Sequence, residues 1–209
     1  MLNLGLPAIL ALAVILLVAF PIHEAAHAWM AYRLGDDTAR RMGRLSLNPL
    51  AHLDPLGSIM LLVAGIGWAK PVPVNPYNLR YGPRVGNALV AGAGPLSNLL
   101  MAALVAIPWR LGVFEGGPPW VRTAATMFVA LNVLLCVFNL IPLAPLDGNS
   151  VLYGIVGQTG AAILAPLRTF GPMILMGLLA IGFIVPGANI LGRILYPAMN
   201  AILRLLLGA

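Results

Sequence analysis

The sequence predicts an all-α polytopic membrane protein, for three reasons. Of its 209 residues, 60% are hydrophobic and 9% are charged, and the mean hydropathy is +0.94. A soluble globular domain has far more charged residues. The apolar residues also form long runs separated by Pro- and Gly-rich breaks. We expect about five spanning helices, a short re-entrant or interfacial apolar segment and an extended Pro-rich loop.

The excess of basic residues does not indicate a nucleic-acid-binding protein. The net charge is +6 and the pI is near 10.3, but Lys and Arg stand singly between the apolar runs. We interpret them as topology signals, because cytoplasmic loops carry an excess of Lys and Arg. The single cysteine, Cys136, lies in an apolar segment, so we expect a packed side chain, no disulfide within the chain and no redox chemistry.

The first predicted helix runs from Leu4 to Leu34 and is apolar up to Pro21, a residue that favours a kink. It lacks the basic start and the cleavage site of a secretory signal, so we expect it to be retained. Near its end lies His23-Glu24-Ala25-Ala26-His27. Four arginines follow this pentapeptide, namely Arg33, Arg40, Arg41 and Arg44. The positive-inside rule therefore places this end in the cytoplasm and the N-terminus outside.

The pentapeptide has the spacing of a metal site. Residues four apart on an α-helix lie about 40° apart around the axis, so His23 and His27 share a face and can hold one Zn²⁺. Glu24 is offset by about 100°, which suits a general base that hydrogen-bonds a metal-bound water. The alternative is two ordinary histidines. However, a charged group near a bilayer centre costs roughly 2.5–3.5 kcal/mol, which a bound metal would offset.

The next residues are predicted not to cross the membrane. Residues 44–55 are polar and carry His52 and Asp54, which we interpret as ordinary solvated groups, with ligation or proton transfer as the alternative. The apolar run Leu56–Trp68 is shorter than the roughly 17–25 residues of a spanning helix, so we expect it to be re-entrant or interfacial. The prolines of the following stretch, GWAKPVPVNPYNLR, exclude a helix and favour an extended course.

Two further long helices are predicted, at Pro83–Trp109 and Arg122–Leu140. The first is rich in Gly and Ala, which predicts close helix packing. It contains Asn98, which we interpret as an interhelical hydrogen-bonding residue, with a position at the metal site as the alternative. The second ends in NLIPLAPLDG, residues 139–148.

Asp147 is the predicted third zinc ligand, because a catalytic zinc usually has three protein ligands and one water. Pro142 and Pro145 break the helix before it, which frees the carboxylate to bend toward a neighbouring helix, and Gly148 allows a tight turn. The alternative is that Asp147 only caps the next helix. The directions of the helices favour Asp147 as a ligand. His27 and Asp147 lie at the same depth in the membrane if a single crossing separates their helices and Leu56–Trp68 does not span.

Two more apolar helices are predicted, at about Pro166–Val185 and Asn189–Leu207, joined by Pro186-Gly187. They carry no candidate ligand, and we interpret them as packing or gating helices with a cytoplasmic C-terminus. We therefore divide the chain into a catalytic transmembrane core of three long helices, residues 1–155, and a C-terminal helix pair, residues 156–209.

Several stretches carry a resemblance to a known family. HEAAH matches an HExxH motif, and NLIPLAPLDG matches a second motif in which an Asn precedes the Asp ligand by eight residues. With LNPLAHLDPLGS, GWAKPVPVN and AGPLSN, these stretches resemble the site-2 protease family of intramembrane zinc metalloproteases over about residues 20–155. The resemblance implies zinc at His23, His27 and Asp147, with Glu24 as catalytic base. It implies Asn139 near the metal-bound water or the developing oxyanion.

The resemblance also implies a membrane-protein substrate that is cut in or near its transmembrane segment. We expect a multi-pass protein of the inner (plasma) membrane with its active site toward the cytoplasm, in contact with lipid and not with nucleic acid. The oligomeric state is not predicted. Asn149-Ser150 stands where many relatives have a small residue and then Arg, so contacts of that Arg are not expected here. Substrate selection by a PDZ module is not expected either.

Two other functions are compatible with such ligands. A catalytically silent zinc-binding scaffold would need the ligands but not Glu24. A metal or proton transporter would need a polar path, yet the outer halves of these helices contain almost no ionisable residues. We therefore predict zinc-assisted peptide hydrolysis with Glu24 as proton carrier. The stretch KPVPVN is expected to hold the unwound substrate as a strand at its edge.

Overall fold

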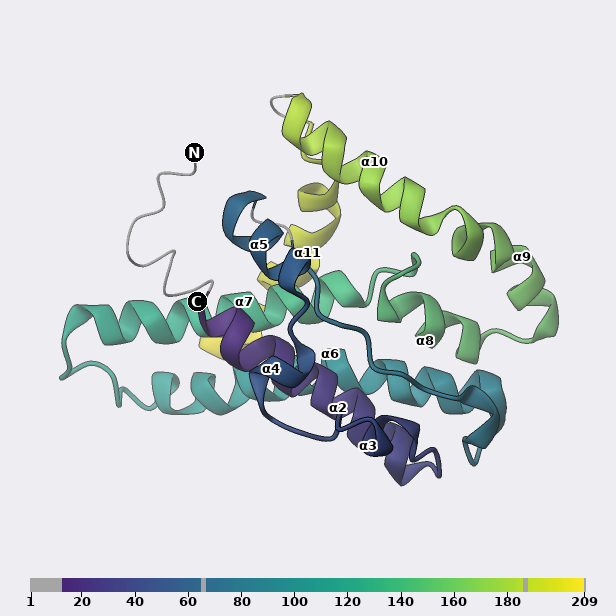
Figure 1. Ribbon diagram of the computed structural model, residues 1–209. Coiled ribbons are helices and arrows are strands. Elements are labelled where there is room, and N and C mark those ends of the chain that lie inside the picture. The colour runs from purple at the N-terminus through teal and green to yellow at the C-terminus, as the bar shows by residue number, and fades with distance from the viewer. Residues whose placement is uncertain (1–12, 65–66, 186–187, 209) are drawn as a thin grey trace.

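The computed structural model describes residues 13–64, 67–185 and 188–208, and within these ranges the chain is built from helices (Figure 1). The only β contact in these ranges is an isolated bridge between Leu53 and Ala69. The predicted all-α fold is therefore confirmed. The elements, in chain order, are η1 (Ile15–Ala19), α2 (Phe20–Arg33), α3 (Thr38–Arg41), α4 (Pro49–His52), α5 (Pro55–Ala64), η2 (Pro76–Asn78), α6 (Gly82–Arg110), α7 (Pro119–Asn139), α8 (Asp147–Ile155), α9 (Gln158–Thr169), α10 (Gly171–Ile184) and α11 (Ile190–Leu207).

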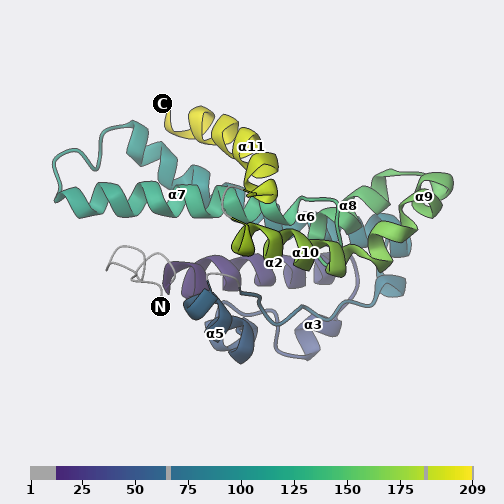
Figure 2. The same cartoon turned by 90° about the horizontal axis from the view of Figure 1, so that it is seen from above.

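Helix α6 is the centre of the molecule, because it packs against α2, α7 and α8. Figure 1 shows that α2 and α7 run in the same direction and that α6 runs in the opposite one. Seen from above, α11, the α6–α7 pair, α2 and the segment with α3 and α5 follow one another as layers (Figure 2). The small residues of α6 allow this close packing, since a Cβ atom at Gly154 of α8 would lie 2.1 Å from the Cβ of Ala88.

The run Leu56–Trp68 leaves the loop region and returns to it. Its helix, α5, has only 10 residues. The bridge between Leu53 and Ala69 joins the two ends of the excursion, and the Lys70 N–H donates to the His52 carbonyl at 2.7 Å. At its far end, Leu61 packs against Ile15 and Leu16. This is the course predicted for a segment that does not span.

The Pro-rich segment that follows is extended, as predicted, and is anchored at both ends. Residues 70–75 form neither helix nor turn. Pro76–Asn78 form the short 3-10 helix η2, so the predicted absence of helix is wrong for these three residues, because Pro76 stands at the first helical position, where no N–H is needed. The buried carboxylate of Asp36 accepts hydrogen bonds from the Asn75 N–H at 2.7 Å and the Asn78 side chain at 3.1 Å. The Arg80 N–H donates to the Leu34 carbonyl at 2.8 Å. These bonds hold the segment against the end of α2.

The expected count of about five spans is approximate. In the described part of the chain, α6, α7 and α11 are long and apolar enough to cross a membrane. The predicted first span, Leu4–Leu34, begins outside the described residues, and its described part is the π-helical turn η1 followed by α2. Pro21 lies in the first turn of α2, directly after η1, where its missing N–H accounts for the irregular helix.

The predicted span Pro166–Val185 is not one straight helix. It is divided between α9 and α10, which are bent by 51°. The break follows Phe170, because Pro172 has no N–H for an intrahelical hydrogen bond. If this bent pair crosses the membrane as one unit, it forms a fourth span beside α6, α7 and α11. The joining turn at 186–187 lies outside the described residues.

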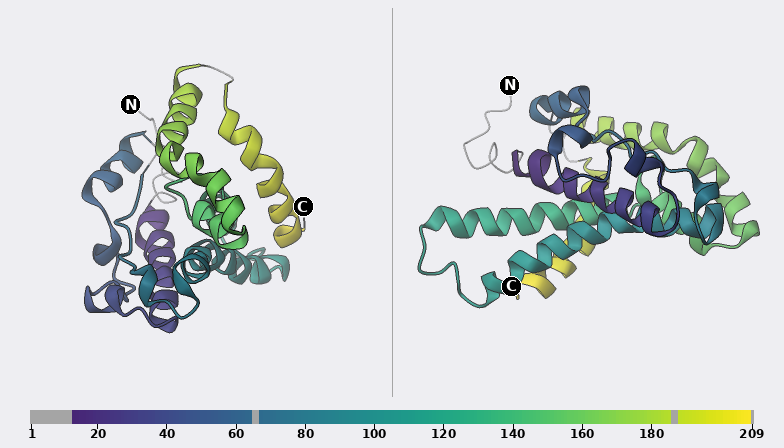
Figure 3. Two further views of the ribbon diagram at one scale, coloured as in Figure 1. Left: turned by 90° about the vertical axis from the view of Figure 1, so that its right-hand side faces the viewer. Right: turned by 60° about the horizontal axis from the view of Figure 1, so that its bottom comes forward.

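The C-terminal helices support the loop before Asp147. Leu175 of α10 and Leu191 and Leu195 of α11 pack with Leu143 and Leu146 in a buried cluster. In the left view of Figure 3, α11 lies at the opposite edge of the molecule from α5, with α10 between them. The prediction of packing helices is therefore confirmed for α10 and α11.

Candidate metal centre

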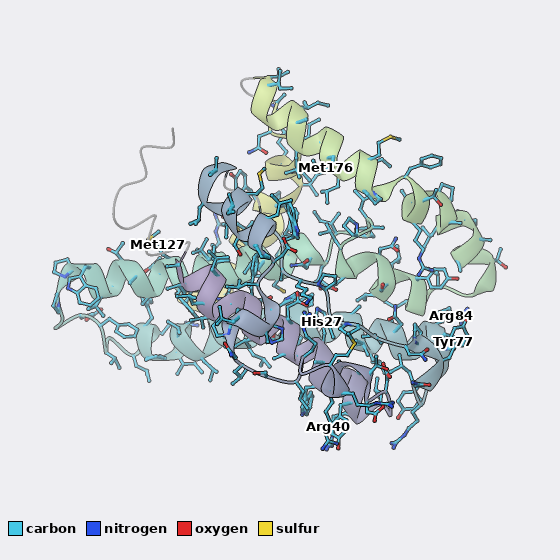
Figure 4. All side chains as sticks on the ribbon, viewed as in Figure 1. His27, Arg40, Tyr77, Arg84, Met127 and Met176 are labelled. Atoms are coloured by element: carbon cyan, nitrogen blue, oxygen red, sulfur yellow. The ribbon has the colours of Figure 1, made fainter. Side chains whose placement is uncertain are left out.

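The structure brings His23, His27 and Asp147 together from two parts of the chain 120 residues apart. The His23 and His27 Nε2 atoms are 3.0 Å apart, and the Asp147 Oδ2 atom lies 3.2 Å from the first and 3.4 Å from the second. Two atoms that bind one tetrahedral zinc are about 3.3 Å apart. The three atoms therefore have the spacing of a zinc ligand set. Figure 4 shows His27 in the middle of the molecule, among the core helices.

The outer nitrogens of both histidines are held by hydrogen bonds. His27 Nδ1 lies 2.8 Å from the Val90 carbonyl of α6, and His23 Nδ1 lies 2.6 Å from the Asn98 side-chain oxygen. A carbonyl only accepts, so His27 carries its proton on Nδ1. Partners of this kind fix the tautomer and orientation of a metal-binding histidine.

The same assignment follows for His23 from a chain of hydrogen bonds across two helices. The Asn132 side-chain amide donates to the Phe128 carbonyl at 2.9 Å, so its oxygen faces Asn98. The Asn98 amide donates to that oxygen at 3.1 Å, which leaves the Asn98 oxygen facing His23. His23 therefore also donates through Nδ1. Asn98 acts as an interhelical hydrogen-bonding residue and as a partner of His23, so both interpretations from sequence hold.

This arrangement fits a cation better than a hydrogen-bond network. With both protons on Nδ1, the two Nε2 lone pairs face each other and a carboxylate oxygen. The buried Oδ2 atom of Asp147 has no hydrogen-bond donor in the described structure. Three acceptors without a hydrogen between them repel one another unless a positive ion joins them. Two imidazoles and one carboxylate are a common donor set for zinc.

Gly94 of α6 leaves the space for this centre. A Cβ atom there would lie 2.3 Å from His27 Nε2 and 2.6 Å from His23 Cε1. Any side chain at this position would therefore displace the histidines. Gly148 has a related role, because a Cβ there would lie 2.2 Å from the Leu140 carbonyl oxygen. The tight turn predicted at Gly148 thus depends on close approach of backbones.

Asp147 is the first residue of α8, but it does not cap the helix. The capping position is Leu146, and no side chain caps α8 within the described residues. The Asp147 carboxylate is directed at the histidines instead. The alternative interpretation, that Asp147 serves only as a cap, is therefore wrong.

A cavity of about 620 Å³ opens onto the centre. Glu24, Asn139 and Ser150 line it together with His23, His27 and Asp147. Glu24 is partly exposed, so its carboxylate is accessible from the cavity. The Asn139 side-chain amide donates to the Leu135 carbonyl at 3.0 Å. All five predicted site residues thus meet at one cavity.

His52 and Asp54 do not take part in this cavity. His52 is fully buried, with Nε2 2.6 Å from the Ser46 carbonyl, so its interpretation as a solvated group is wrong. Asp54 accepts a hydrogen bond from the Gly57 N–H at 2.8 Å at the start of α5. Arg44 is also buried and donates to the Lys70 carbonyl, so it has a structural role besides its charge. The short polar loop needs these contacts because it folds back on itself.

Comparison with curated proteins identifies the family. The chain is 37% identical over 196 residues to YwhC of Bacillus subtilis, whose name describes a zinc metalloprotease, and the match covers 91% of this chain and 86% of YwhC. The chain belongs to the site-2 protease family of intramembrane zinc metalloproteases. It is accordingly a membrane protein and a zinc metalloprotease.

Two further site-2 protease relatives are both named Rip2 and described as zinc metalloproteases. The chain is 32% identical over 178 residues to Rip2 of Mycobacterium tuberculosis and 30% identical over 177 residues to Rip2 of Mycolicibacterium smegmatis. Each match covers 83% of this chain and 66% of the relative. No family model and no solved structure matches the chain.

Proposed function

We propose that His23, His27 and Asp147 hold the catalytic zinc and that Glu24 is the general base. The observation that carries this proposal is the convergence of three acceptor atoms, 3.0 to 3.4 Å apart, on the wall of the cavity that Glu24 also lines. A structural zinc site needs no such carboxylate on an open cavity, because its coordination is closed.

Glu24 and Asn139 then have separate roles in peptide hydrolysis. Bound zinc supplies Lewis acidity, which lowers the pKa of a water toward about 7 and polarises the scissile carbonyl. Glu24 takes a proton from the attacking water and delivers it to the leaving amine nitrogen as the C–N bond breaks. Asn139 keeps one amide hydrogen beyond its bond to Leu135 and donates it to the developing oxyanion.

Replacing Glu24 tests this assignment. The Glu24→Gln variant should keep about one zinc per chain and lose about 10²–10⁴-fold in cleavage rate, the usual contribution of a general base. Zinc is measured by elemental analysis of the purified protein. Substrates are identified as membrane proteins that accumulate in cells carrying the variant. Unchanged cleavage by Glu24→Gln would sink the proposal, and loss of zinc would assign Glu24 to metal binding.

The substrate is a membrane protein cut in or near its transmembrane segment, held as a strand beside residues 71–74. A helical substrate hides its peptide bonds, so it has to unwind first. Val72 and Val74 line the catalytic cavity. Their backbone groups make no hydrogen bond with the described part of the chain and are free to pair with an added strand. Pro73 cannot donate, so this edge offers fewer bonds than an ordinary strand.

Photo-cross-linking locates the substrate. A photoreactive residue at position 72 or 74 of the Glu24→Gln variant should cross-link to a trapped substrate. The same residue in place of Val63, which is exposed on α5 and outside the cavity, serves as the control. Equal cross-linking at all three positions, or none at 72 and 74, would remove the strand proposal and leave the assignment of Glu24 untouched.

The orientation is also a proposal, with the N-terminus outside and the active site toward the cytoplasm of the plasma membrane. The parallel course of α2 and α7, and the arginines that follow α2, support it. Under this orientation α6 ends outside at Arg110, whose guanidinium donates to the Leu205 carbonyl near the end of α11 at 3.1 Å. The C-terminal end of α11 therefore lies outside as well, which does not fit the cytoplasmic C-terminus expected from the sequence. Reporter fusions at the C-terminus should accordingly report an external location. The division at residue 155 into a catalytic core and a C-terminal pair remains a proposal too. The packing of α10 and α11 on Leu143 and Leu146 implies that the core depends on that pair.

A further inference from the structure

A second cavity lies at the other end of the seam between α6 and α8. Its volume is about 860 Å³, and it is bounded by the first turn of α6, by α8 and by one face of α9. Asn87 and Ser150 line the catalytic cavity. Arg84, three residues before Asn87 on α6, and Tyr153, three residues after Ser150 on α8, line this one. Figure 4 shows Arg84 at the end of the molecule where α6 begins, away from His27. The second cavity is therefore a separate site.

Two arginines line this cavity without a counter-ion. The chain has six acidic residues in all, and none of them lines it. Arg84 is half-buried and forms no ion pair with a described residue. The Arg168 guanidinium lies over the Tyr153 ring, with Cζ 4.9 Å from the ring centroid. Two cations on one partly enclosed cavity repel each other, so an anion between them would be stabilised.

The start of α6 adds to the positive potential. Tyr81 occupies the capping position and provides no side-chain cap. The N–H group of Arg84 lies in the first helical turn, where no intrahelical acceptor is available. The N-terminal end of so long a helix carries a partial positive charge. The helix end therefore adds to the positive potential of the two arginines in the cavity and would attract an anion only weakly without them.

The remaining walls distinguish among anionic ligands. Ala161, Ala162 and Ala165 give the face of α9 toward the cavity a small apolar surface. Tyrosine side chains, here Tyr81 and Tyr153, are typical of the membrane–water interface. A free phosphate ion would contact only the two arginines, and an acidic peptide would leave the alanine face of α9 without an apolar partner. A phospholipid would contact the arginines with its phosphate and the alanines with an acyl chain.

We propose that this cavity binds the headgroup of an anionic phospholipid, with its phosphate between Arg84 and Arg168 and an acyl chain along the alanine face of α9. The ligand fills the space between α9 and the start of α6, which the protein leaves unfilled. The site adjoins the catalytic cavity but shares no described residue with it.

Native mass spectrometry of the full chain tests this proposal. The Glu24→Gln protein in detergent is titrated with phosphatidylglycerol or phosphatidylcholine and compared with versions that also carry Arg84→Gln, Arg168→Gln or both. One basic residue near an anionic lipid surface contributes enough to expect about a fivefold loss of phosphatidylglycerol affinity for each change and about thirtyfold for both. Phosphatidylcholine binding should be weak and unaffected.

The matched control is Arg33→Gln. Arg33 also carries a cation–π contact, with Trp29, and lies outside the cavity. It should leave phosphatidylglycerol binding unchanged. An equal loss for Arg33→Gln and for the cavity variants would show general surface attraction and overturn the proposal. Unchanged binding by the double variant would overturn it too. Zinc content and elution volume confirm that each variant is folded.

Two soluble competitors distinguish a bound lipid from a free phosphate ester and from an acidic peptide. Glycerol 3-phosphate should compete only weakly, because it lacks the acyl chain, and a hexaglutamate peptide should not displace the lipid. Displacement by glycerol 3-phosphate at the lipid's own concentration would assign the cavity to a free phosphate ester. Displacement by the peptide would assign it to an acidic segment of a protein. Either result would overturn the lipid assignment.

Discussion

The metal centre and the cluster around Asp36 are both buried polar groups, and they differ in how donors and acceptors are matched. Asp36, at the end of α2, accepts hydrogen bonds from Thr38, Asn75 and Asn78 and is fully buried. Asp147 faces two nitrogen lone pairs and no hydrogen. A cluster whose donors match its acceptors is complete and serves the fold. A cluster of acceptors alone requires a cation, and this marks it as a functional site.

The histidines show the same contrast. His23 and His27 turn Nδ1 to protein acceptors and Nε2 to a common point. His52 is buried more completely, but it meets only the Ser46 carbonyl, and no ligand atom of another described residue converges on it. Burial of a histidine therefore does not indicate a metal site, whereas convergence of lone pairs does.

Replacing the carboxylate of each cluster should affect different properties: zinc affinity at the metal centre, where the effect is largest, and stability at the Asp36 cluster. Asp147→Ala should weaken zinc binding by more than about 100-fold, because even the loss of an outer partner costs 10–100-fold. Its thermal stability without zinc should fall little, since the variant removes repulsion among acceptors. Asp36→Asn should keep zinc and lose about 1–3 kcal/mol of stability. Zinc titration with a competing chelator and thermal unfolding measure the two effects. Zinc loss in Asp36→Asn would contradict the distinction.

A methyl group placed next to the centre should act almost as strongly as the loss of a ligand. In Gly94→Ala, the new Cβ would lie 2.3 Å from His27 Nε2, so the histidines have to move and zinc binding should be lost. Gly92→Ala, on the same helix, is the matched control, because its Cβ meets only Val151 at 3.8 Å. Bound zinc and cleavage are measured for both. Full zinc occupancy in Gly94→Ala would show that the centre is formed differently.

Loss of an outer partner should have an intermediate effect. Asn98→Ala leaves His23 without its acceptor and should reduce zinc affinity about 10–100-fold. Asn132→Ala acts one step further out and should reduce it less. Asn98→Asp keeps an oxygen toward His23 and should restore most of the affinity, a rescue that a mere packing defect would not show. The zinc affinities of these variants are measured by titration with a competing chelator, as for Asp147→Ala. Equal affinities for Asn98→Ala and the unaltered protein would make the hydrogen bond irrelevant to the centre.

Spacing and helix breaks were enough to predict much of the fold and the meeting of His23, Glu24, His27 and Asp147, whereas Asn139 was assigned to the site only through the family resemblance. His23 and His27 share a helical face by geometry alone, and the prolines before Asp147 predict the break that frees its carboxylate. The short length of Leu56–Trp68 predicts that α2 and α7 are parallel. These inferences succeed because each depends on local geometry or on the thickness of a membrane.

The outer partners depend on tertiary contacts, which the sequence does not show. Asn132 is a single polar residue in an apolar helix, a signal equal to that of Asn98, and it was missed because only its register against α6 gives it a role. Gly94 is one of several small residues in α6, and only the position of α2 makes it essential. The burial of His52 and Arg44 depends on how the loop folds back.

The Asp36 cluster should show its own signature in the dependence of stability on pH, and this is the smallest effect. Burial raises the pKa of Asp36, but the hydrogen bonds from Thr38, Asn75 and Asn78 outweigh it and lower the pKa below the ordinary value of 3.8. The ionised carboxylate thus stabilises the fold above about pH 4, and this contribution is lost as the pH falls through the lowered pKa.

The measurement compares Asp147→Ala with the double variant Asp147→Ala/Asp36→Asn, so that zinc does not contribute. The difference in thermal unfolding, followed by tryptophan fluorescence in detergent, should be constant from pH 7 to about pH 4 and shrink below it. A difference that grows on acidification would mean that protonated Asp36 is the stabilising form. The donors around Asp36 would then not be matched to an ionised carboxylate. The claim that the Asp36 cluster is a complete structural cluster, unlike the metal centre, would be wrong.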